Sequence, residues 1–371
     1  MKVAFVNSMR SVGGGERWLL ETAGGLRERG HLVSIVARSG SKLADAARED
    51  GHPVLELRMS GDLDPPSVLG LSGWLRRERP DVLSVNVQRA VRIGCVAARL
   101  SGVGAVVERR GLNFEVRPTA LNRWVYRRCL SLVIANCDEI ADGLVESGLV
   151  PSDRTVVVPN GIDPSRVPPG GGRELRSELG IDPAAPLVSV VARLVRDKGH
   201  VHAFDGFGRL LERVPRARLL IVGDGKLEAE LRERAGEVAP DGSIIFAGRR
   251  DDVPAVLDAS DALLVASLRE GMPHSILEAM VAGTPIVATR IAGIPEMLAE
   301  GREALLVPPG SADAIGTALN RVLTEEGLGR RLSQAARRRV LADFSLDGMI
   351  EATERQFLRL ARTSPGRGRV S

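Results

Sequence analysis

The sequence predicts an α/β fold in which two Rossmann-like domains with parallel sheets face a central cleft. Its length of 371 residues fits two domains at ~150 residues each. Short runs of Val, Ile and Leu alternate with amphipathic stretches along almost the whole chain, which is typical of parallel strands covered by helices on both faces. A stretch rich in Pro and Gly at 163–172 interrupts this alternation, because it can continue neither a helix nor a strand.

The apolar runs give the expected strands in order. We expect strands in the N-terminal half at 3–6, 32–37, 82–85, 105–108, 132–135 and 155–158, and in the C-terminal half at 187–191, 218–222, 243–246, 262–265, 285–288 and 304–307. Helical periodicity lies between them, for example at 16–29 and 226–235. The sequence therefore predicts domains at 1–165 and 173–345, a helix at about 346–361 after the second sheet, and a disordered tail at 362–371.

The composition excludes several classes of protein. Aromatic residues make up 3% of the chain and the net charge is +4, so we expect no nucleic-acid partner. The three cysteines, Cys95, Cys129 and Cys137, form no CxxC pair, which fits a reducing cytoplasm better than a disulfide framework or a zinc ribbon. No apolar run approaches the ~18–20 residues of a membrane span, and residues 1–6 indicate a first strand rather than a signal peptide.

The basic residues are almost all arginines. Of the 51 Lys and Arg residues, only Lys2, Lys42, Lys198 and Lys226 are lysines. A single arginine is therefore weak support for a functional site in this chain, and a lysine in a loop that follows a strand is stronger support.

Three loops after expected strands carry residues suited to a phosphate. The run 13–16 (Gly-Gly-Gly-Glu) opens a helix, where glycines admit a ligand and the helix N-terminus favours an anion; a plain strand-to-helix turn is the alternative. Arg193 and Lys198 follow the 187–191 strand and suit either a diphosphate clamp or a solvated basic loop. The run 223–225 (Gly-Asp-Gly) suits a ligand contact or a turn in which the aspartate caps a helix.

The fourth loop, at 270–280, is the most informative. Pro273 and Ser275 suit a helix start, whose N-terminus would hold a phosphate. Glu270 and Glu278 lie on either side of that start. Because a carboxylate repels a phosphate, two carboxylates here suggest hydroxyl groups on both sides of it, as in a sugar nucleotide.

At these residues the chain resembles the retaining GT-B glycosyltransferases of family 4, the glycosyl transferases group 1. The spacing Glu-x7-Glu at 270–278 resembles the family signature, within the longer stretch 270–296. Other matching motifs occur in the same order: Gly14-Gly15-Glu16, 29–31 (Arg-Gly-His), 158–163 (Val-Pro-Asn-Gly-Ile-Asp), Arg193-x4-Lys198, 223–225 and 246–248. The resemblance covers nearly the whole chain.

The resemblance implies an acceptor domain at 1–165, joined by the crossover helix, and a nucleotide-sugar domain at 173–345. It implies Glu270, Arg193 and Lys198 as catalytic residues. The implied donor-binding residues are Gly14, Gly15, Arg193, Lys198, Gly223, Gly248, Arg249, Gly271, Met272, Pro273, His274, Ser275, Ile276 and Glu278. It also implies a front-face reaction in which the leaving diphosphate helps to deprotonate the acceptor, because no carboxylate nucleophile is evident.

The N-terminal half departs from the family pattern. Many members carry a His at the end of a strand where this chain has Arg110, and the stretch after 82–85, Asn86-Val87-Gln88, has no His either. We expect Glu16, Arg109 and Arg110 to contact the acceptor or an anionic group, with Arg110 as plain surface charge the alternative.

Basic charge is concentrated on the acceptor side. Residues 86–131 hold nine arginines and two glutamates, with Trp124 and Tyr126 among them on an expected helix. This suggests peripheral contact with anionic lipid; the alternative is a solvated helix with Trp124 in the core.

The sequence thus predicts a hexosyltransferase-like enzyme that moves a sugar from a nucleoside-diphosphate donor to a glycan, lipid-linked or small-molecule acceptor with retention. We expect it in the cytoplasm, or peripherally at the inner face of the membrane. We expect no cofactor and no metal, because the five histidines form no ligand set. The alternatives are a GT-B epimerase or hydrolase and a catalytically silent protein that binds sugar nucleotides.

Overall fold

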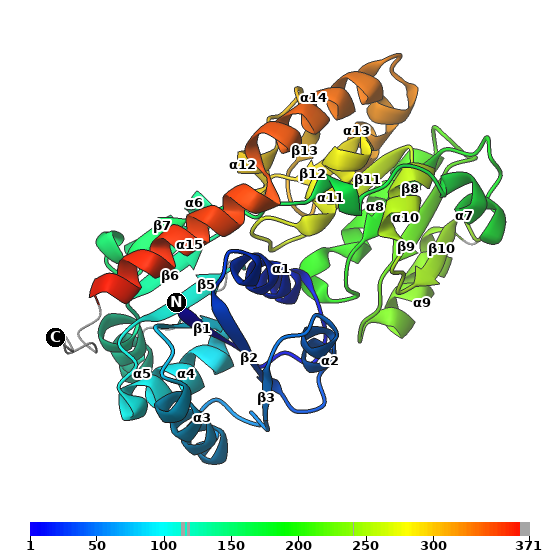
Figure 1. Cartoon of the computed structure of the whole chain (residues 1–371). Helices are drawn as coiled ribbons and strands as arrows, with labels where there is room; N and C mark the ends of the chain where they lie inside the picture. Colours follow the sequence, from blue (N-terminus) through cyan, green and yellow to red (C-terminus); the bar gives the residue numbers. More distant parts are fainter. Residues whose placement is uncertain (113–115, 117–118, 240, 364–371) are drawn as a thin grey trace. The chain divides into compact units, whose positions relative to one another are not determined.

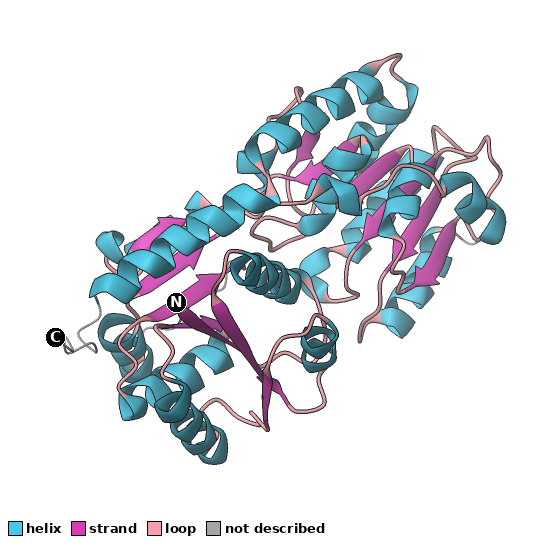
Figure 2. Ribbon diagram, in the orientation of Figure 1, coloured by secondary structure: helices cyan, strands magenta, loops and turns pink. Residues whose placement is uncertain are grey.

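The computed structural model describes residues 1–112, 116, 119–239 and 241–363. By internal contacts the chain divides into two units: Met1–Asn160 together with the chain from Leu346 onward, and Gly161–Ser345. Each unit contains its own parallel sheet with helices on both faces (Figures 1 and 2). The expected α/β class with two Rossmann-like sheets is confirmed. Of the tail expected at 362–371, residues 364–371 lie outside the described residues.

The first unit is built on a seven-stranded parallel sheet with the order β3-β2-β1-β4-β5-β6-β7. Its strands are β1 (Lys2–Asn7), β2 (Leu32–Arg38), β3 (Val54–Leu57), β4 (Val82–Asn86), β5 (Val106–Arg110), β6 (Leu132–Ala135) and β7 (Thr155–Val157). The sequence did not predict β3. It is a four-residue edge strand whose residues are all only half-buried, so it lacks the continuous apolar run of a central strand.

Side-chain caps start some of the helices of this unit and not others. They are α1 (Gly14–Glu28), α2 (Lys42–Glu49), α3 (Pro65–Glu78), α4 (Gln88–Ser101), α5 (Ala120–Trp124) and α6 (Asp138–Glu146), with a π-helical turn η1 (Val125–Cys129) and a 3₁₀ turn η2 (Ser152–Arg154). Ser41 caps α2 by accepting from the Ala44 N–H. The helix expected around 124–128 is therefore a short α-helix that continues as a π-turn.

The last helix, α15 (Leu346–Thr363), completes the first unit and packs beside α1 (Figure 1). Phe357 is fully buried, and its ring lies 6.2 Å from that of Phe5 in β1. Glu354 accepts from Arg29 at 2.8 Å and lies 2.6 Å from His31. Burial opposes ionisation of Glu354, but the hydrogen bonds from His31 and Arg29 hold its pKa below the usual range. Apolar packing and charge together attach this helix to a sheet formed more than 180 residues earlier in the chain.

The second unit contains a six-stranded parallel sheet with the order β10-β9-β8-β11-β12-β13. The strands are β8 (Leu187–Val191), β9 (Arg218–Val222), β10 (Ile244–Gly248), β11 (Ala262–Val265), β12 (Ile286–Thr289) and β13 (Leu305–Val307). Around it lie α7 (Gly172–Glu178), α8 (His200–Leu211), α9 (Glu228–Val238), α10 (Val253–Ala259), α11 (His274–Ala282), α12 (Ile294–Met297), α13 (Ala312–Thr324) and α14 (Leu328–Asp343), with 3₁₀ turns η3 (Pro164–Arg166) and η4 (Arg196–Lys198).

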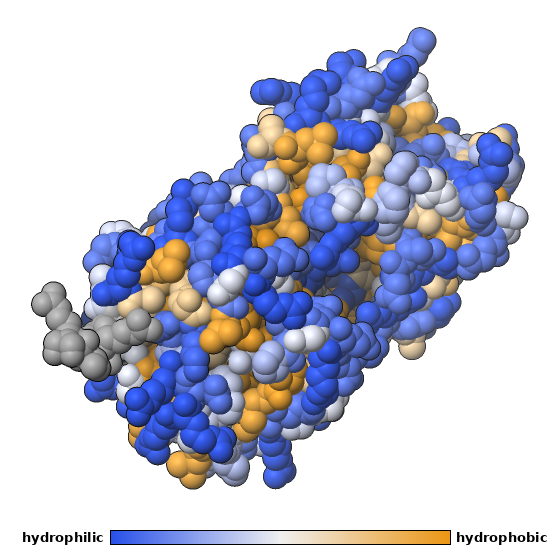
Figure 3. All heavy atoms as spheres, in the orientation of Figure 1, coloured by the Kyte–Doolittle hydropathy of each residue, from blue (hydrophilic) through white to orange (hydrophobic). Residues whose placement is uncertain are grey.

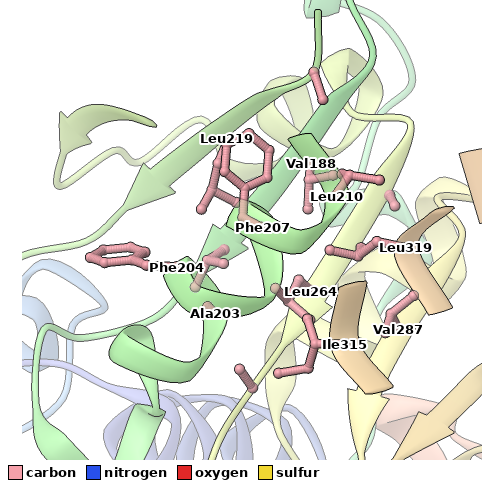
Figure 4. Packing of buried hydrophobic residues seen from close by; sticks show 14 of the residues in the cluster. Val188, Ala203, Phe204, Phe207, Leu210, Leu219, Leu264, Val287, Ile315 and Leu319 are labelled. Carbon is pink, nitrogen blue, oxygen red and sulfur yellow. The ribbon is translucent and has the colours of Figure 1, made fainter. Parts of the chain in front are cut away.

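Helix α8 provides much of the apolar core of the second unit. Phe204, Phe207 and Leu210 lie on one face of the helix and are fully buried against β8, β9 and α13 (Figure 4). Their i, i+3, i+6 spacing places them on one side of the helix. This packing fixes α8, and with it the loop between β8 and α8.

The surface view shows hydrophilic side chains over most of the visible face, with apolar residues in separate patches (Figure 3). Within the described part of the chain, no helix is both long enough and apolar enough to span a membrane.

Candidate functional site

The predicted donor-binding loops of the second unit follow strands of its sheet, so they lie at the carboxyl ends of those strands. The chain runs from β8 outward to β9 and β10 and then returns to the other side of β8 with β11 (Figure 1). Strand order therefore reverses between β8 and β11, and ligands of open α/β sheets bind beyond the carboxyl ends of strands at such a point. Lys198 follows β8 and Glu270 follows β11, so the two residues flank this switch point.

Lys198 and Glu270 are in direct contact. The Lys198 ammonium donates to Glu270 Oε1 at 2.5 Å, and the Ser267 hydroxyl donates to the same oxygen at 2.8 Å. The Glu270 side chain is 6% exposed and that of Lys198 is 17% exposed. The sequence predicted Lys198 and Glu270 separately but not their pairing. It did not identify Ser267, whose only sequence signal is its place two residues after the end of a strand.

Gly199 makes this pairing possible. It has a φ of +65°, and a Cβ atom on it would lie 2.0 Å from the Ala266 carbonyl oxygen. Only glycine tolerates both conditions. The Leu268 N–H also donates to the Asp197 carbonyl at 2.8 Å. Backbone contact between the loops after β8 and β11 therefore places the ammonium beside the carboxylate.

The loop after β9 packs in the same way against the loop after β8. A Cβ on Gly223 would lie 2.0 Å from the Ala192 carbonyl oxygen, and one on Gly225 would lie 2.4 Å from that of Leu194. Asp224 is exposed, and α9 begins later with Leu227 as its N-cap residue. The interpretation of Asp224 as a helix cap is therefore wrong. These glycines are required for loop packing.

The N-terminus of α11 lies in the loop that carries Glu270. The helix begins at His274 after Pro273, without a side-chain cap, and its first N–H groups lack intrahelical acceptors. Met272 and Ile276 are buried and hold this turn, while Glu278 is 8% exposed in the second turn. Leu277, Met280 and Val281 form a buried apolar stripe on this helix. The remaining predicted residues of this loop lie with them: Gly271 is buried, and His274 and Ser275 are half-buried.

Two of the predicted donor contacts are exposed arginines. The Arg193 side chain makes no hydrogen bond or ion pair with any residue that the structure describes, and Arg249 after Gly248 is 42% exposed with Asp251 at 3.7 Å. The next residue, Arg250, is instead bound by Glu178 and Asp252, which raise its pKa.

His200, at the start of α8, is a further titratable group near Lys198. It is 2% exposed, and burial together with the Lys198 charge lowers its pKa to about 4. This histidine is therefore neutral at neutral pH and adds no charge to the site.

In the first unit, Glu16 has a local structural role. Gly13 is the N-cap residue of α1, and Glu16 Oε2 accepts from its N–H at 3.0 Å, while Oε1 accepts from the Asn7 amide at 2.9 Å. The Glu16 carboxylate, expected at the acceptor, is thus already bound. Gly14 is the first residue of α1, and a Cβ on Gly15 would meet no atom within 4 Å.

Arg109 and Arg110 are buried at the end of β5, each 7% exposed. Arg109 donates to Asn160 Oδ1 at 2.5 Å and its guanidinium stacks 4.9 Å from the Trp18 ring centre. Burial lowers the pKa of Arg109 to about 10, and the Glu16 charge opposes this shift. Arg110 lies 3.4 Å from Glu108 Oε1, so its interpretation as surface charge is wrong.

Tyr126 forms hydrogen bonds with both members of the Arg110–Glu108 pair. It accepts from Arg110 and donates to Glu108, both at 3.2 Å. Burial raises the pKa of Glu108 and that of Tyr126, so the phenol stays protonated.

The basic segment 86–131 contains both buried and exposed residues. Trp124 is 39% exposed, so its placement in the core is wrong, whereas Tyr126 is buried. Part of the positive charge is used internally, as described for Arg109 and Arg110. The exposed arginines on α4, α5 and η1 are Arg99, Arg123, Arg127 and Arg128. Glu115 and Arg117 lie outside the described residues.

Comparisons with known proteins identify the family. The model of the glycosyl transferases group 1 matches residues 172–339, and that of Glycosyltransferase Family 4 matches residues 12–166. A 2-deoxystreptamine glucosyltransferase of Streptomyces kanamyceticus is 30% identical over 274 residues, which cover 68% of this chain and 70% of that protein. The UDP-Gal:alpha-D-GlcNAc-diphosphoundecaprenol alpha-1,3-galactosyltransferase of Escherichia coli is 25% identical over 363 residues, which cover 93% of this chain and 94% of that protein.

Solved structures agree on the fold. The Anabaena protein HepE, solved with UDP-glucose, superposes with a TM-score of 0.87 at 21% identity, covering 97% of this chain and 100% of that one. The chain therefore belongs to the glycosyltransferases of the GT-B fold, with a family 4 N-terminal half and a group 1 C-terminal half, and it is a glycosyl-transferring enzyme.

Proposed function

We propose that this enzyme transfers a sugar from a nucleoside-diphosphate donor to a glycan or lipid-linked acceptor, with retention of the anomeric configuration. The observation that carries the proposal is the Lys198–Glu270 pair at the switch point of the second sheet. The names of the relatives support the reactant classes: the E. coli relative is named for a UDP-galactose donor and a diphosphoundecaprenol-linked acceptor.

The site offers separate groups for the two parts of such a donor. Lys198, exposed Arg193 and the first N–H groups of α11 provide positive charge and donors for a diphosphate. Glu270 and Glu278 are buried acceptors suited to neutral hydroxyl groups, those of the transferred sugar and of the ribose. In this arrangement Glu270 also holds Lys198 in position.

Retention follows from a front-face reaction. The bond from the anomeric carbon to the diphosphate oxygen breaks, and the acceptor oxygen forms its bond on the same face. The acceptor proton passes to the leaving diphosphate. The protein stabilises the charge on that leaving group, and one such donor contributes about 10²–10³ in rate. Because Glu270 is bound by Lys198 and Ser267, we assign it to positioning rather than to nucleophilic attack.

The test combines binding with turnover. UDP-, GDP- and ADP-glucose are compared for the rise in melting temperature that each produces in the full chain. Lys198→Met should remove that rise, whereas Lys226→Ala, an exposed lysine of the same unit, should leave it intact. The anomeric coupling constant in proton NMR of the product then reports retention or inversion.

Several outcomes would overturn the proposal. Binding without nucleotide release for any acceptor would indicate a silent binding protein. Nucleotide release to water alone would indicate a hydrolase. An inverted product would refute the front-face reaction. Peripheral contact with anionic lipid through Trp124 and the exposed arginines around it belongs to the same proposal, and flotation with phosphatidylglycerol vesicles tests it.

A further inference from the structure

The first sheet has its own switch point, between β1 and β4. The chain runs from β1 to β2 and β3, and β4 then pairs with the other side of β1. In register, Ala37 of β2 lies opposite Asn7 of β1, and Asn7 lies opposite Asn86 of β4. Adjacent strands are about 4.8 Å apart, so the ends of these three strands lie close together at the edge where a ligand of this unit would bind.

Three arginines extend from these strand ends. Arg38 directly follows Ala37, Arg10 lies in the loop after Asn7, and Arg89 is in the first turn of α4 after Asn86. The charges of Arg10 and Arg89 act on Arg38; burial, and then these two like charges, lower the pKa of Arg38. The Arg38 guanidinium is therefore close enough to those of Arg10 and Arg89 to be repelled by both.

Few carboxylates neutralise this cluster. The side chains of Arg10 and Arg38 make no hydrogen bond or ion pair with the part of the chain that the structure describes. Arg89 has a long ion pair with Asp62 at 3.9 Å, and Asp62 also binds Arg92. By contrast, Arg109 and Arg110, at the end of the next strand, are bound within the protein. Positive charge available to a ligand thus lies at the ends of β1, β2 and β4.

An unpartnered amide lies at the same edge. Asn86 is 3% exposed, and neither its Oδ1 nor its Nδ2 has a hydrogen-bond partner among the described residues. Both polar atoms of Asn7, opposite it, are used, by Glu16 and by the Met9 N–H. A buried amide without partners costs folding free energy, and a hydroxyl, which both donates and accepts, would satisfy it.

We propose that Arg10, Arg38 and Arg89 bind a phosphate group of the acceptor, with Asn86 binding a hydroxyl beside it. The acceptor is thus a phosphorylated polyhydroxyl compound, either a free sugar phosphate or a lipid-linked one. This inference rests on the proposed function, because it assigns the acceptor of that reaction. Guanidinium groups suit phosphate oxygens through paired N–H donors, and the ligand would relieve the repulsion of Arg38 by Arg10 and Arg89.

The test uses full-length protein saturated with whichever of UDP, GDP and ADP it binds, so that the donor site is filled. Binding of glucose 6-phosphate, of glucose and of phosphatidylglycerol vesicles is measured by calorimetry and co-sedimentation, at two salt concentrations. We expect glucose 6-phosphate or the vesicles to bind, more weakly at high salt, and glucose to bind at least about tenfold more weakly. Arg38→Gln and Arg10→Gln should each weaken binding about tenfold. Arg77→Gln, an exposed arginine at the far end of α3, should leave it unchanged.

Stability provides a readout that does not depend on binding. Without acceptor, Arg38→Gln should raise the melting temperature, because it removes a like charge from the cluster. A lower melting temperature would show that Arg38 has a structural role and would overturn the inference. Three binding results would also overturn it: equal binding of glucose and glucose 6-phosphate, no binding of either phosphate probe, or an equal loss of binding in Arg77→Gln. Binding of vesicles alone, weakened by Arg38→Gln and Arg10→Gln, would assign the phosphate to a lipid. Failure of UDP, GDP and ADP alike to bind would refute the proposed function itself, a result distinguishable from loss of acceptor binding.

Discussion

Replacement of Lys198 by methionine tests whether the Lys198–Glu270 pair organises the site. The variant keeps most of the side-chain volume but leaves the Glu270 carboxylate, 6% exposed, with Ser267 as its remaining described partner. Removing one member of a fully buried ion pair costs about 3–5 kcal/mol. Because Lys198 is 17% exposed and water screens it, we expect a smaller loss, about 2–3 kcal/mol. For a unit of this size that loss lowers the melting temperature by roughly 5–10 °C.

The distribution of tryptophans gives this experiment an internal control. Trp18, Trp74 and Trp124 all lie in the first unit, so tryptophan fluorescence follows that unit, whereas circular dichroism at 222 nm follows the helices of both. Lys198→Met should shift the transition seen by circular dichroism and leave the fluorescence transition in place.

A second substitution completes a double-mutant cycle. Adding Glu270→Gln to Lys198→Met removes the uncompensated charge, so at least half of the lost stability should return while sugar transfer stays abolished. If Lys198→Met is as stable as the parent protein, or if the second substitution restores nothing, the two side chains are not coupled and the reasoning fails.

Further predictions concern loop packing and the last helix. Gly199→Ala should destabilise the second unit by about 2 kcal/mol or more, because its Cβ would clash with the Ala266 carbonyl. The control is Gly180→Ala, where the residue has a similar φ of +64° but open space around it, so the loss of stability should be only about 1–2 kcal/mol. Urea unfolding followed by circular dichroism compares the two variants, and equal losses would contradict the packing argument. Phe357→Ala should cost the first unit about 3–5 kcal/mol, measured by tryptophan fluorescence, and an unchanged midpoint would show that α15 does not stabilise that unit. Glu354 has a folded pKa below its unfolded value, so its stabilisation is present at neutral pH and is lost as pH falls below the unfolded pKa and through the lowered folded pKa. Glu354→Gln should lower stability at pH 7 and flatten this acid dependence, and an unaltered profile would refute the assignment.

Much of the fold was predictable because buried parallel strands have a strong local signature. The apolar runs that became β1, β4, β8 and β11 are continuous, and each strand that the sequence predicted lies within a residue or two of its expected position. Strand β3 lacked that signature because it is a short, half-exposed edge strand. The π-turn at Val125–Cys129 was also not predictable, since a single widened turn leaves almost no mark on helical periodicity.

The sequence singled out both residues of the Lys198–Glu270 pair but not the contact between them. Scarcity of lysine singled out Lys198, and spacing singled out Glu270, but the two residues are 72 positions apart. Their contact depends on the loop packing at Gly199. Conversely, Arg109 and Arg110 were expected to be available to an acceptor and are buried with internal partners, Asn160 and Glu108.

By itself, the sequence determined the α/β class, the order of strands and helices along the chain, and the family, because local periodicity and motif spacing indicate each of them. The tertiary structure alone decided the order of strands in each sheet, and hence the two switch points. It also decided which of the 51 basic residues are neutralised and which remain available to a ligand. The physical reason is that a charge acquires its role from whichever carboxylate folding places beside it, and in this chain those carboxylates often come from distant segments.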